Sequence, residues 1–188
     1  MPNTKENILR FAAHSFRKVG YKATSMRIIA KEIGIQAPSI YNHFDKKEDI
    51  LEELLMNVAN LFTKGMKEIN TNFQSPTEKM EKLIELHVQL TIEHTDAIAL
   101  IPSEWIYLKK STLKKYTRLR DQYENDFKEI LEEGKKKKEF NIVDTEIAMF
   151  SILSTLRWLY TWYSKNISSK PEVLNEQMVR CLLEGIKR

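Results

Sequence analysis

Cysteine, glycine and proline are scarce in this chain, and none of its apolar runs is long. A single cysteine, Cys181, excludes an intramolecular disulfide and a cysteine-rich metal site. The five glycines and five prolines fall mostly at the ends of expected helices. Charged residues interrupt every apolar run well before membrane-spanning length, and the N-terminus has no apolar stretch of signal-peptide length. We therefore expect a soluble, cytoplasmic protein that does not enter a membrane.

The sequence motifs of common enzymes are also missing. The chain has no dinucleotide fingerprint, no glycine-rich phosphate loop, no G-x-S-x-G elbow and no H-E-x-x-H zinc motif. Glu132 and Glu133 are neighbours on an expected helix, so their carboxylates diverge and make a poor acid–base pair. His87 and His94 lie seven residues apart, with Glu93 beside the second, but core or surface histidines are favoured over a metal site. We expect no enzyme, no catalytic residue, no metal and no cofactor.

Apolar residues recur every three to four positions through most of the chain, which is the spacing of amphipathic helices. No alternation of apolar and polar residues indicates a strand, and no internal repeat is present. The pattern predicts an all-α fold of about nine helices, one of them kinked or split by Pro102 and one ended by Gly134. Outside the segment described next, the expected helices span residues 4–19, 46–69, 77–94, 97–108, 112–133, 145–163 and 172–186.

The most informative segment runs from Thr24 to Lys47, TSMRIIAKEIGIQAPSIYNHFDKK, and has the pattern of a helix-turn-helix. Gly34 ends a first short helix, whose apolar face is formed by Ile28, Ile29 and Ile33. A second helix can start at Pro38, whose ring pushes Ala37 out of the helical region, and continue to about Phe44. A short polar and aromatic helix with almost no Asp or Glu suits the DNA major groove.

The distribution of charge supports this interpretation. Residues 1–50 hold nine Lys and Arg against five Asp and Glu, whereas the remaining residues hold 21 of each kind. All the excess positive charge therefore lies on the helix-turn-helix segment, as expected for phosphate binding. Asp45 and Glu48 then predict a capping box for the long helix 46–69, which would join the DNA-reading segment to the rest of the chain.

The run from Gly20 to Leu51, GYKATSMRIIAKEIGIQAPSIYNHFDKKEDIL, resembles the N-terminal domain of the TetR family of bacterial repressors. The shared features are a glycine before an aromatic residue, Thr-Ser before the second helix, Gly-Ile at the turn and Tyr-x-His-Phe-x-x-Lys-Glu after it. The other two thirds resemble the family only in length and helical character. The resemblance implies a helix-turn-helix DNA-binding domain over residues 1–48 and an effector-binding and dimerisation domain over 49–188. It also implies a homodimeric repressor that binds a palindromic operator on double-stranded DNA.

The resemblance also implies which residues contact DNA: Ser25, Arg27, Gln36, Ala37, Pro38, Ser39, Tyr41, His43 and Lys47. Gln36 and Ser39 can hydrogen-bond base edges, while Lys47 can pair with a phosphate as a point charge. Two alternatives stay open. Tyr41 can pack partly against the first helix, and Ser25 can serve as a helix N-cap.

The C-terminal part carries many aromatic residues, which at helical spacing are more often core than ligand site. In the TetR family such a bundle houses an effector pocket, and its last two helices form the dimer. The resemblance therefore implies an effector site that includes Trp105, Tyr123, Phe127, Phe150, Arg157 and Trp158. The implied dimer interface combines Leu156, Leu159, Tyr160 and Tyr163 with Val173, Leu174, Met178, Cys181, Leu182 and Ile186. Arg157 could instead hold a buried carboxylate.

The segments SEWIYL, RDQYENDF and RWLYTWY are similar to those of family members that bind acyl-CoA thioesters. That subgroup often has an arginine before the final Trp-Tyr, where this chain has Thr161. A hydrophobic or amphipathic effector is expected first, with a fatty-acyl-CoA as its most specific form. A multidrug-type cation held by aromatic faces and Glu104 comes second. The rival classes are a helical lipid- or acyl-binding protein that does not read DNA and a non-specific DNA-packaging protein.

Overall fold

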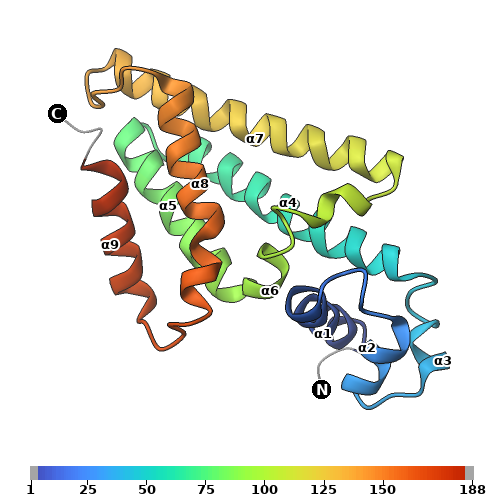
Figure 1. Cartoon of the computed structure of the whole chain (residues 1–188). Helices are drawn as coiled ribbons and strands as arrows, with labels where there is room; N and C mark the ends of the chain where they lie inside the picture. Colours follow the sequence, from blue (N-terminus) through green and yellow to red (C-terminus); the bar gives the residue numbers. More distant parts are fainter. Residues whose placement is uncertain (1–3, 185–188) are drawn as a thin grey trace. The chain divides into compact units, whose positions relative to one another are not determined.

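The computed structural model describes residues 4–184, and over this range it confirms an all-α fold (Figure 1). None of the helices in this range is long and apolar enough to cross a membrane. The helices in chain order are α1 (Thr4–Val19), α2 (Met26–Glu32), α3 (Ala37–Ile40), α4 (Lys47–Asn72), α5 (Pro76–Glu93), α6 (Thr95–Ile98), the 3-10 helix η1 (Glu104–Tyr107), α7 (Lys110–Lys136), α8 (Thr145–Tyr163) and α9 (Pro171–Leu183).

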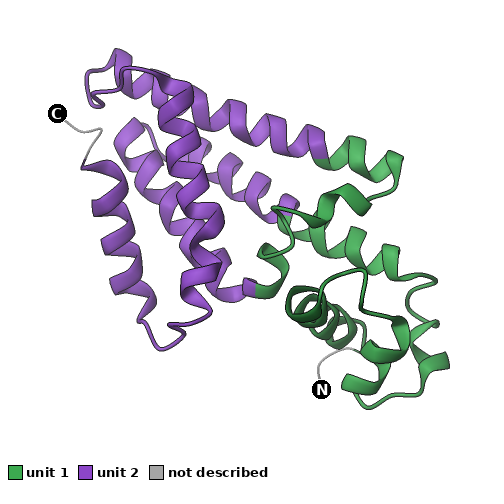
Figure 2. Ribbon diagram, in the orientation of Figure 1, with its two compact units in different colours: residues 1–58, 96–116 green, residues 59–95, 117–188 purple. Residues whose placement is uncertain are grey.

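The chain divides into two compact units, shown in different colours in Figure 2. Unit 1 contains the described part of residues 1–58 together with residues 96–116, and unit 2 contains residues 59–95 and the described part of 117–188. This division differs from the single boundary expected after residue 48. The difference arises because a segment from the middle of the chain packs with the N-terminal helices, and sequence order does not reveal such packing.

The helix-turn-helix forms as expected, but one residue of its first helix differs from expectation in its burial. Gly34 has a φ of +73°, a left-handed conformation that glycine adopts without strain, and it follows the end of α2. Ile29 is fully buried, but Ile28 is 39% exposed rather than part of the apolar face. Val19, the last residue of α1, is likewise 54% exposed. Both residues lie at the margin of a short amphipathic face, where periodicity alone does not decide burial.

The second half of the motif also differs from expectation. The extended residue before α3 is Gln36, with ψ of 140°, and Ala37 lies inside the first turn of the helix. The small Ala37 side chain tolerates this position before Pro38, so the pre-proline restriction acts only as a bias. Helix α3 ends at Ile40, and residues 41–43 form a turn, so the reading helix is shorter than predicted.

Helix α4 begins one residue later than the expected capping box requires. The backbone N–H of Lys46 donates to Asp49 Oδ2 at 3.0 Å, so Asp49 rather than Glu48 supplies the reciprocal bond. The helix also continues to Asn72, which shortens the linker that was expected over residues 70–76. Pro102 does split its region as predicted, leaving α6 and η1 as separate short helices.

Unit 2 is a helical bundle in which α5 contacts both α8 and α9. Its core is mainly apolar, with Met66, Met80, Leu83, Ile84, Phe127 and Leu131 each fully buried. Gly134, which was expected to end a helix, lies inside α7 instead. A Cβ at this position would lie 2.1 Å from the Phe140 ring, so glycine is needed here for close packing. The chain turns just after α7, where Lys138 has a φ of +60°.

Candidate nucleic-acid interface and effector domain

Unit 1 presents most of the predicted DNA contacts on the surface of α2, α3 and the turn that follows. Arg27, Gln36, Tyr41 and His43 are exposed, with Tyr41 at 50%. On α3 itself, Pro38 is exposed, while Ala37 and Ser39 are half-buried. Within the part of the chain that the structure describes, the side chains of Arg27, Tyr41 and His43 make no hydrogen bond or ion pair. Their polar atoms are therefore available to DNA.

Ser25 serves as the N-cap of α2, one of the two roles considered for it. Its hydroxyl accepts a hydrogen bond from the backbone N–H of Ile28 at 3.3 Å. Beside it, the Thr24 hydroxyl donates to the carbonyl of Gly20 at 3.0 Å. The Ser25 bond orders the start of α2, because it satisfies a backbone N–H that the helix itself leaves unpaired, and the Thr24 bond orders the loop before it. Ser25 remains exposed, so capping leaves it on the surface with the other predicted DNA contacts.

Lys47 has a structural role that sequence analysis did not predict. Its ammonium donates to the carbonyl of Tyr21 at 2.7 Å and to that of Thr24 at 2.8 Å. The same ammonium lies 4.3 Å from the centre of the Tyr21 ring, a cation–π contact. Lys47 thereby ties the start of α4 to the loop between α1 and α2. The side chain is half-buried, and its donors point toward the protein backbone.

The segment 96–116 forms ion pairs with the N-terminal helices inside unit 1. Asp96, in the first turn of α6, accepts from Arg17 at 2.7 Å and lies 3.2 Å from His14 Nδ1. Both partners belong to α1, about 80 positions earlier in the sequence. No local pattern marks such a pair, because surface carboxylates and cations are common throughout this chain. Asp96 is therefore a functional candidate that sequence analysis missed.

Three further contacts join the same segment to the N-terminal part of unit 1. The Tyr107 ring stacks on Tyr21 with a centroid distance of 5.0 Å. Lys109 Nζ lies 2.5 Å from Asp49 Oδ1, and the Lys109 backbone N–H donates to Glu52 at 3.1 Å. The hydrogen bond from Lys109 holds the pKa of Asp49 below its usual range. Residues 96–116 are thus attached to the beginning of α4 as well as to α1.

The six residues expected to line the effector site are divided between the two units. Trp105 lies in unit 1, and the other five lie in unit 2. Tyr123 and Phe127 are buried core residues, whereas Phe150 and Trp158 are 68% and 55% exposed on α8. Helix α8 carries apolar residues on all sides, so its sequence does not reveal which side faces the core. Arg157 pairs with Glu124 at 2.5 Å, and this carboxylate is half-buried rather than the buried one considered as an alternative partner.

The expected dimer interface must be corrected for the same reason. Leu156, Leu159, Tyr163 and Leu174 pack inside the bundle, each no more than 9% exposed. Met178 and Leu182 pack partly against this core, while Tyr160 is half-buried and Cys181 is exposed. Ile186 lies outside the described residues. On their outer face, α8 and α9 carry Ile147, Phe150, Trp158, Trp162 and Val173, which are each at least 45% exposed. Of these, only Val173 belongs to the expected interface.

His87, expected to be an ordinary core or surface histidine, forms a buried polar pair with Tyr123. Its Nε2 lies 2.8 Å from the hydroxyl of Tyr123, and both residues are buried. Burial, together with the positive charge of Arg157, lowers the pKa of His87 to about 3. Burial also raises the pKa of Tyr123. Both side chains are therefore uncharged at neutral pH. The sequence feature that could have indicated this burial is the position of His87 between Ile84 and Val88 on the apolar face of a helix.

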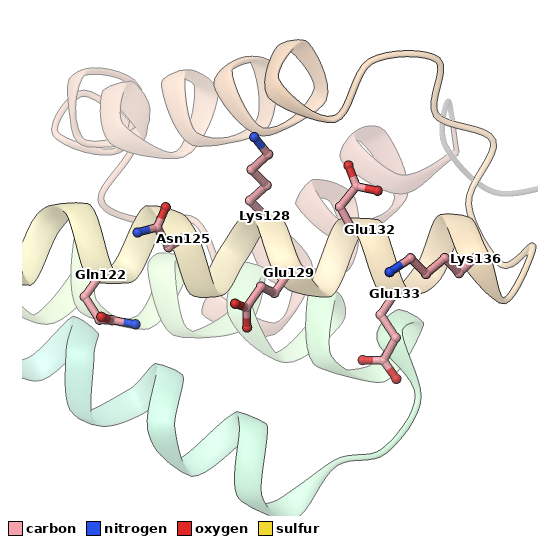
Figure 3. Close-up of a pocket in the computed structure, with 7 residues that line it drawn as sticks. All are labelled: Gln122, Asn125, Lys128, Glu129, Glu132, Glu133 and Lys136. Atoms are coloured by element: carbon pink, nitrogen blue, oxygen red, sulfur yellow. The ribbon is translucent and has the colours of Figure 1, made fainter.

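A hollow of about 600 Å³ on the outer side of α7 has a different character (Figure 3). Its lining is entirely polar or charged: Gln122, Asn125, Lys128, Glu129, Glu132, Glu133 and Lys136. Figure 3 shows Glu132 and Glu133 pointing to different sides of the helix, as expected for sequence neighbours. Lys128 pairs with Glu146, and Glu133 with Lys79 and Lys137. This lining does not suit a hydrophobic effector.

Comparison with known proteins gives matches over most of the chain. Residues 8–54 match the family model for bacterial regulatory proteins of the tetR family, and residues 74–186 match the tetracyclin repressor-like C-terminal domain. The HTH-type transcriptional repressor KstR2 of Rhodococcus jostii is 27% identical over 185 residues, which cover 97% of this chain and 90% of that protein.

Solved structures have the same fold. The ketosteroid transcriptional regulator KstR2 of Mycobacterium tuberculosis has a TM-score of 0.92 at 22% identity, covering 100% of this chain and 97% of that one. AibR, solved in complex with isovaleryl coenzyme A and operator DNA, has a TM-score of 0.81 at 21% identity, covering 96% of this chain and 98% of that one.

Proposed function

This chain belongs to the TetR family of bacterial transcriptional regulators, and on that premise we propose that it is a homodimeric repressor of a palindromic operator, released by a small effector. The exposed polar surface of α2, α3 and the following turn carries the proposal. Arg27, Gln36, Tyr41 and His43 are exposed there, on the segment that also holds the excess positive charge of the chain. Phosphate contacts would orient this surface, and contacts to base edges would give it sequence preference.

The outer face of α8 and α9 supports dimerisation. Trp158 and Trp162 are 55% and 45% exposed, and Phe150 is 68% exposed. Trp158 stacks on the neighbouring Tyr160 at 5.9 Å, so large aromatic side chains are concentrated on this part of the helix. Contiguous apolar surfaces of this kind commonly mark protein interfaces. A two-fold dimer formed through this face would present two reading helices, and successive major grooves on one side of DNA lie about 34–36 Å apart.

The effector is proposed to be hydrophobic or amphipathic, with a fatty-acyl-CoA as its most specific form. The core of unit 2 is apolar apart from a few polar groups, which suits the buried part of such a molecule. AibR, a structural neighbour, was solved with isovaleryl coenzyme A, and KstR2 is described as a ketosteroid regulator. These names favour a ligand with an apolar body over a multidrug-type cation.

Release of the operator would require the effector to bind better to a state in which unit 1 no longer fits DNA. The chain offers three covalent connections for this coupling: α4 and α7 each continue from one unit into the other, and α5 leads directly into α6. Asp96 lies at the third connection, in the first turn of α6, and pairs with Arg17 and His14 of α1. A typical coupling of about 1–3 kcal/mol would weaken operator binding roughly 5- to 150-fold.

Genomic footprinting with the purified protein tests the proposal, because it recovers bound sites whatever their sequence. Fluorescence anisotropy on the recovered site should then give binding at least about 1000-fold tighter than on a scrambled duplex. Equal affinity for both duplexes would instead favour a DNA-packaging protein. Absence of DNA binding at low salt would favour a helical lipid- or acyl-binding protein.

A further inference from the structure

The apolar interior of unit 2 contains one buried hydrogen-bonded pair of side chains from different helices. His87 of α5 and Tyr123 of α7 are 5% and 7% exposed, and the imidazole Nε2 lies 2.8 Å from the phenol oxygen. Phe62 of α4 lies against both rings, with centroid distances of 4.6 Å to His87 and 5.8 Å to Tyr123. Three helices therefore enclose this pair and give it one aromatic wall.

Helices α4 and α5 approach each other closely beside this pair. Gly65 lies one turn after Phe62, and a Cβ added to it would lie 2.5 Å from the Leu86 side chain. Leu86 directly precedes His87, so this contact fixes the position of the histidine relative to Phe62. The pair is thus held by packing on its α4 side, as a recognition group needs to be.

The pair has more hydrogen-bonding capacity than it uses. A neutral imidazole has one donor nitrogen and one acceptor nitrogen, and a phenol can both donate and accept. Across residues 4–184, the only side-chain hydrogen bond of His87 runs through Nε2 to Tyr123, which leaves its Nδ1 uncommitted. The unused Nδ1 of His87 can therefore serve a further hydrogen bond to a bound molecule.

The electrostatic surroundings select against a charged partner. His87 stays neutral down to low pH because burial and the charge of Arg157 lower its pKa to about 3. The cation that influences both side chains is this same Arg157, which is already paired with Glu124 at 2.5 Å. A carboxylate buried beside His87 and Tyr123 would lack a free counter-charge, whereas an uncharged oxygen would need only hydrogen bonds.

We propose that His87 and Tyr123 recognise an uncharged carbonyl or hydroxyl oxygen on the buried part of the effector, and that they discriminate against a free carboxylate. This inference rests on the proposed function, since it places the oxygen of the effector in the bundle of unit 2. A thioester and a cyclic ketone share the required carbonyl, so either ligand type satisfies the site. The pair contributes position and specificity, while the apolar core around it contributes most of the contact area.

Matched ligands test the inference on the wild-type protein. Isothermal titration calorimetry should be run with octanoyl-coenzyme A, with S-octyl-coenzyme A, which lacks the carbonyl, and with free octanoate. A second arm uses androst-4-ene-3,17-dione and the carbonyl-free 5α-androstane. In whichever arm binds, removal of the carbonyl should weaken binding about tenfold, as expected for one buried hydrogen bond. The arm that binds also distinguishes a thioester from a ketone.

Protein variants provide the complementary test. Tyr123→Phe removes only the hydroxyl and should weaken the carbonyl ligand about tenfold while leaving the affinity for its carbonyl-free analogue the same. Tyr163→Phe is the matched control, because Tyr163 is a buried tyrosine of the same bundle. Circular dichroism melts check that both variants fold. If Tyr123→Phe does not fold, the matched ligands on the wild-type protein still decide the question.

Three results would overturn the inference: binding of octanoate as tight as that of octanoyl-coenzyme A, equal binding of a ligand and its carbonyl-free analogue, or no binding by either carbonyl ligand. Operator binding of the wild-type protein is measured separately by fluorescence anisotropy. Failure to bind a defined operator contradicts the proposed function, whereas specific operator binding together with any of these three results contradicts only the role of His87 and Tyr123.

Discussion

Replacing Lys47 distinguishes a structural lysine from a phosphate ligand. The ammonium donates to two backbone carbonyls, of Tyr21 and Thr24, at 2.7 and 2.8 Å and lies over the Tyr21 ring. Lys47→Met keeps most of the aliphatic stem but removes all these contacts. A hydrogen bond from a charged group contributes roughly 1.5–3 kcal/mol, but the two bonds share one ammonium and the side chain is only half-buried. We expect a loss of about 2 kcal/mol in the free energy of unfolding.

For a chain of this length, that loss lowers the melting temperature by roughly 4–8 °C. Operator affinity should fall by a similar factor at every salt concentration, because the loop that leads into α2 loses its attachment to α4. The slope of log affinity against log salt should therefore stay the same. A phosphate ligand behaves differently, since its removal reduces the slope by about 0.9 per subunit.

The assay combines thermal melts with anisotropy titrations between roughly 50 and 200 mM KCl, the range over which phosphate contacts change affinity strongly. Lys46→Met is the control, because it removes the same charge from the exposed neighbouring residue. A Lys47→Met protein with unchanged melting temperature and a salt slope reduced by about 0.9 per subunit would refute the structural role. It would also establish the phosphate contact that the sequence resemblance implies.

Four further predictions address the reading surface, the dimer, the coupling and the core. Gln36→Ala should cost about 1–3 kcal/mol on the operator and relax preference at particular base pairs, and an equal loss on random DNA would contradict base reading. Trp158→Glu should leave a folded monomer by light scattering, because the side chain is exposed in the single chain; a persistent dimer would place the interface elsewhere. Asp96→Ala should reduce the effector-induced change in operator affinity at least threefold in anisotropy titrations, and an unchanged ratio would exclude this ion pair from the coupling. The pKa of His87 is lowered to about 3 in the folded chain, so the unfolded chain takes up a proton on this histidine at a higher pH than the folded chain does. The free energy of unfolding should therefore fall as the pH drops from about 6.5 towards 3, by at most about 1.4 kcal/mol per pH unit. Urea unfolding at pH 7 and pH 5 should show a smaller loss of unfolding free energy for His87→Gln than for the wild-type protein. An equal loss in both proteins would mean that His87 does not cause the pH dependence.

Much of the fold was predictable because helix signals are local. The bounds of α1 and α8 agree with the expected ranges 4–19 and 145–163, and Pro102 splits its helix as its missing N–H requires. Gly34 and Pro38 locate the helix-turn-helix for equally local reasons. The expectation for Gly134 was wrong, because the role of this glycine depends on a contact with another part of the chain. It was expected to end a helix, but it lies inside α7, where its missing Cβ leaves room for the ring of Phe140.

The sequence by itself determined the helical class, the position of the DNA-reading motif and the family, because each is written in neighbouring residues or in a contiguous run. Only the tertiary structure decided which side of α8 is buried, so that Leu156 packs in the core while Trp158 remains exposed. It also decided that Lys47 faces the backbone, that Asp96 pairs with α1 and that His87 meets Tyr123. These polar contacts join residues 23 to 82 positions apart in the sequence. The buried side of α8 depends on which helices surround it, since α8 is apolar on all sides. Periodicity carries no information on either, because it records how a helix is patterned and not which helices surround it.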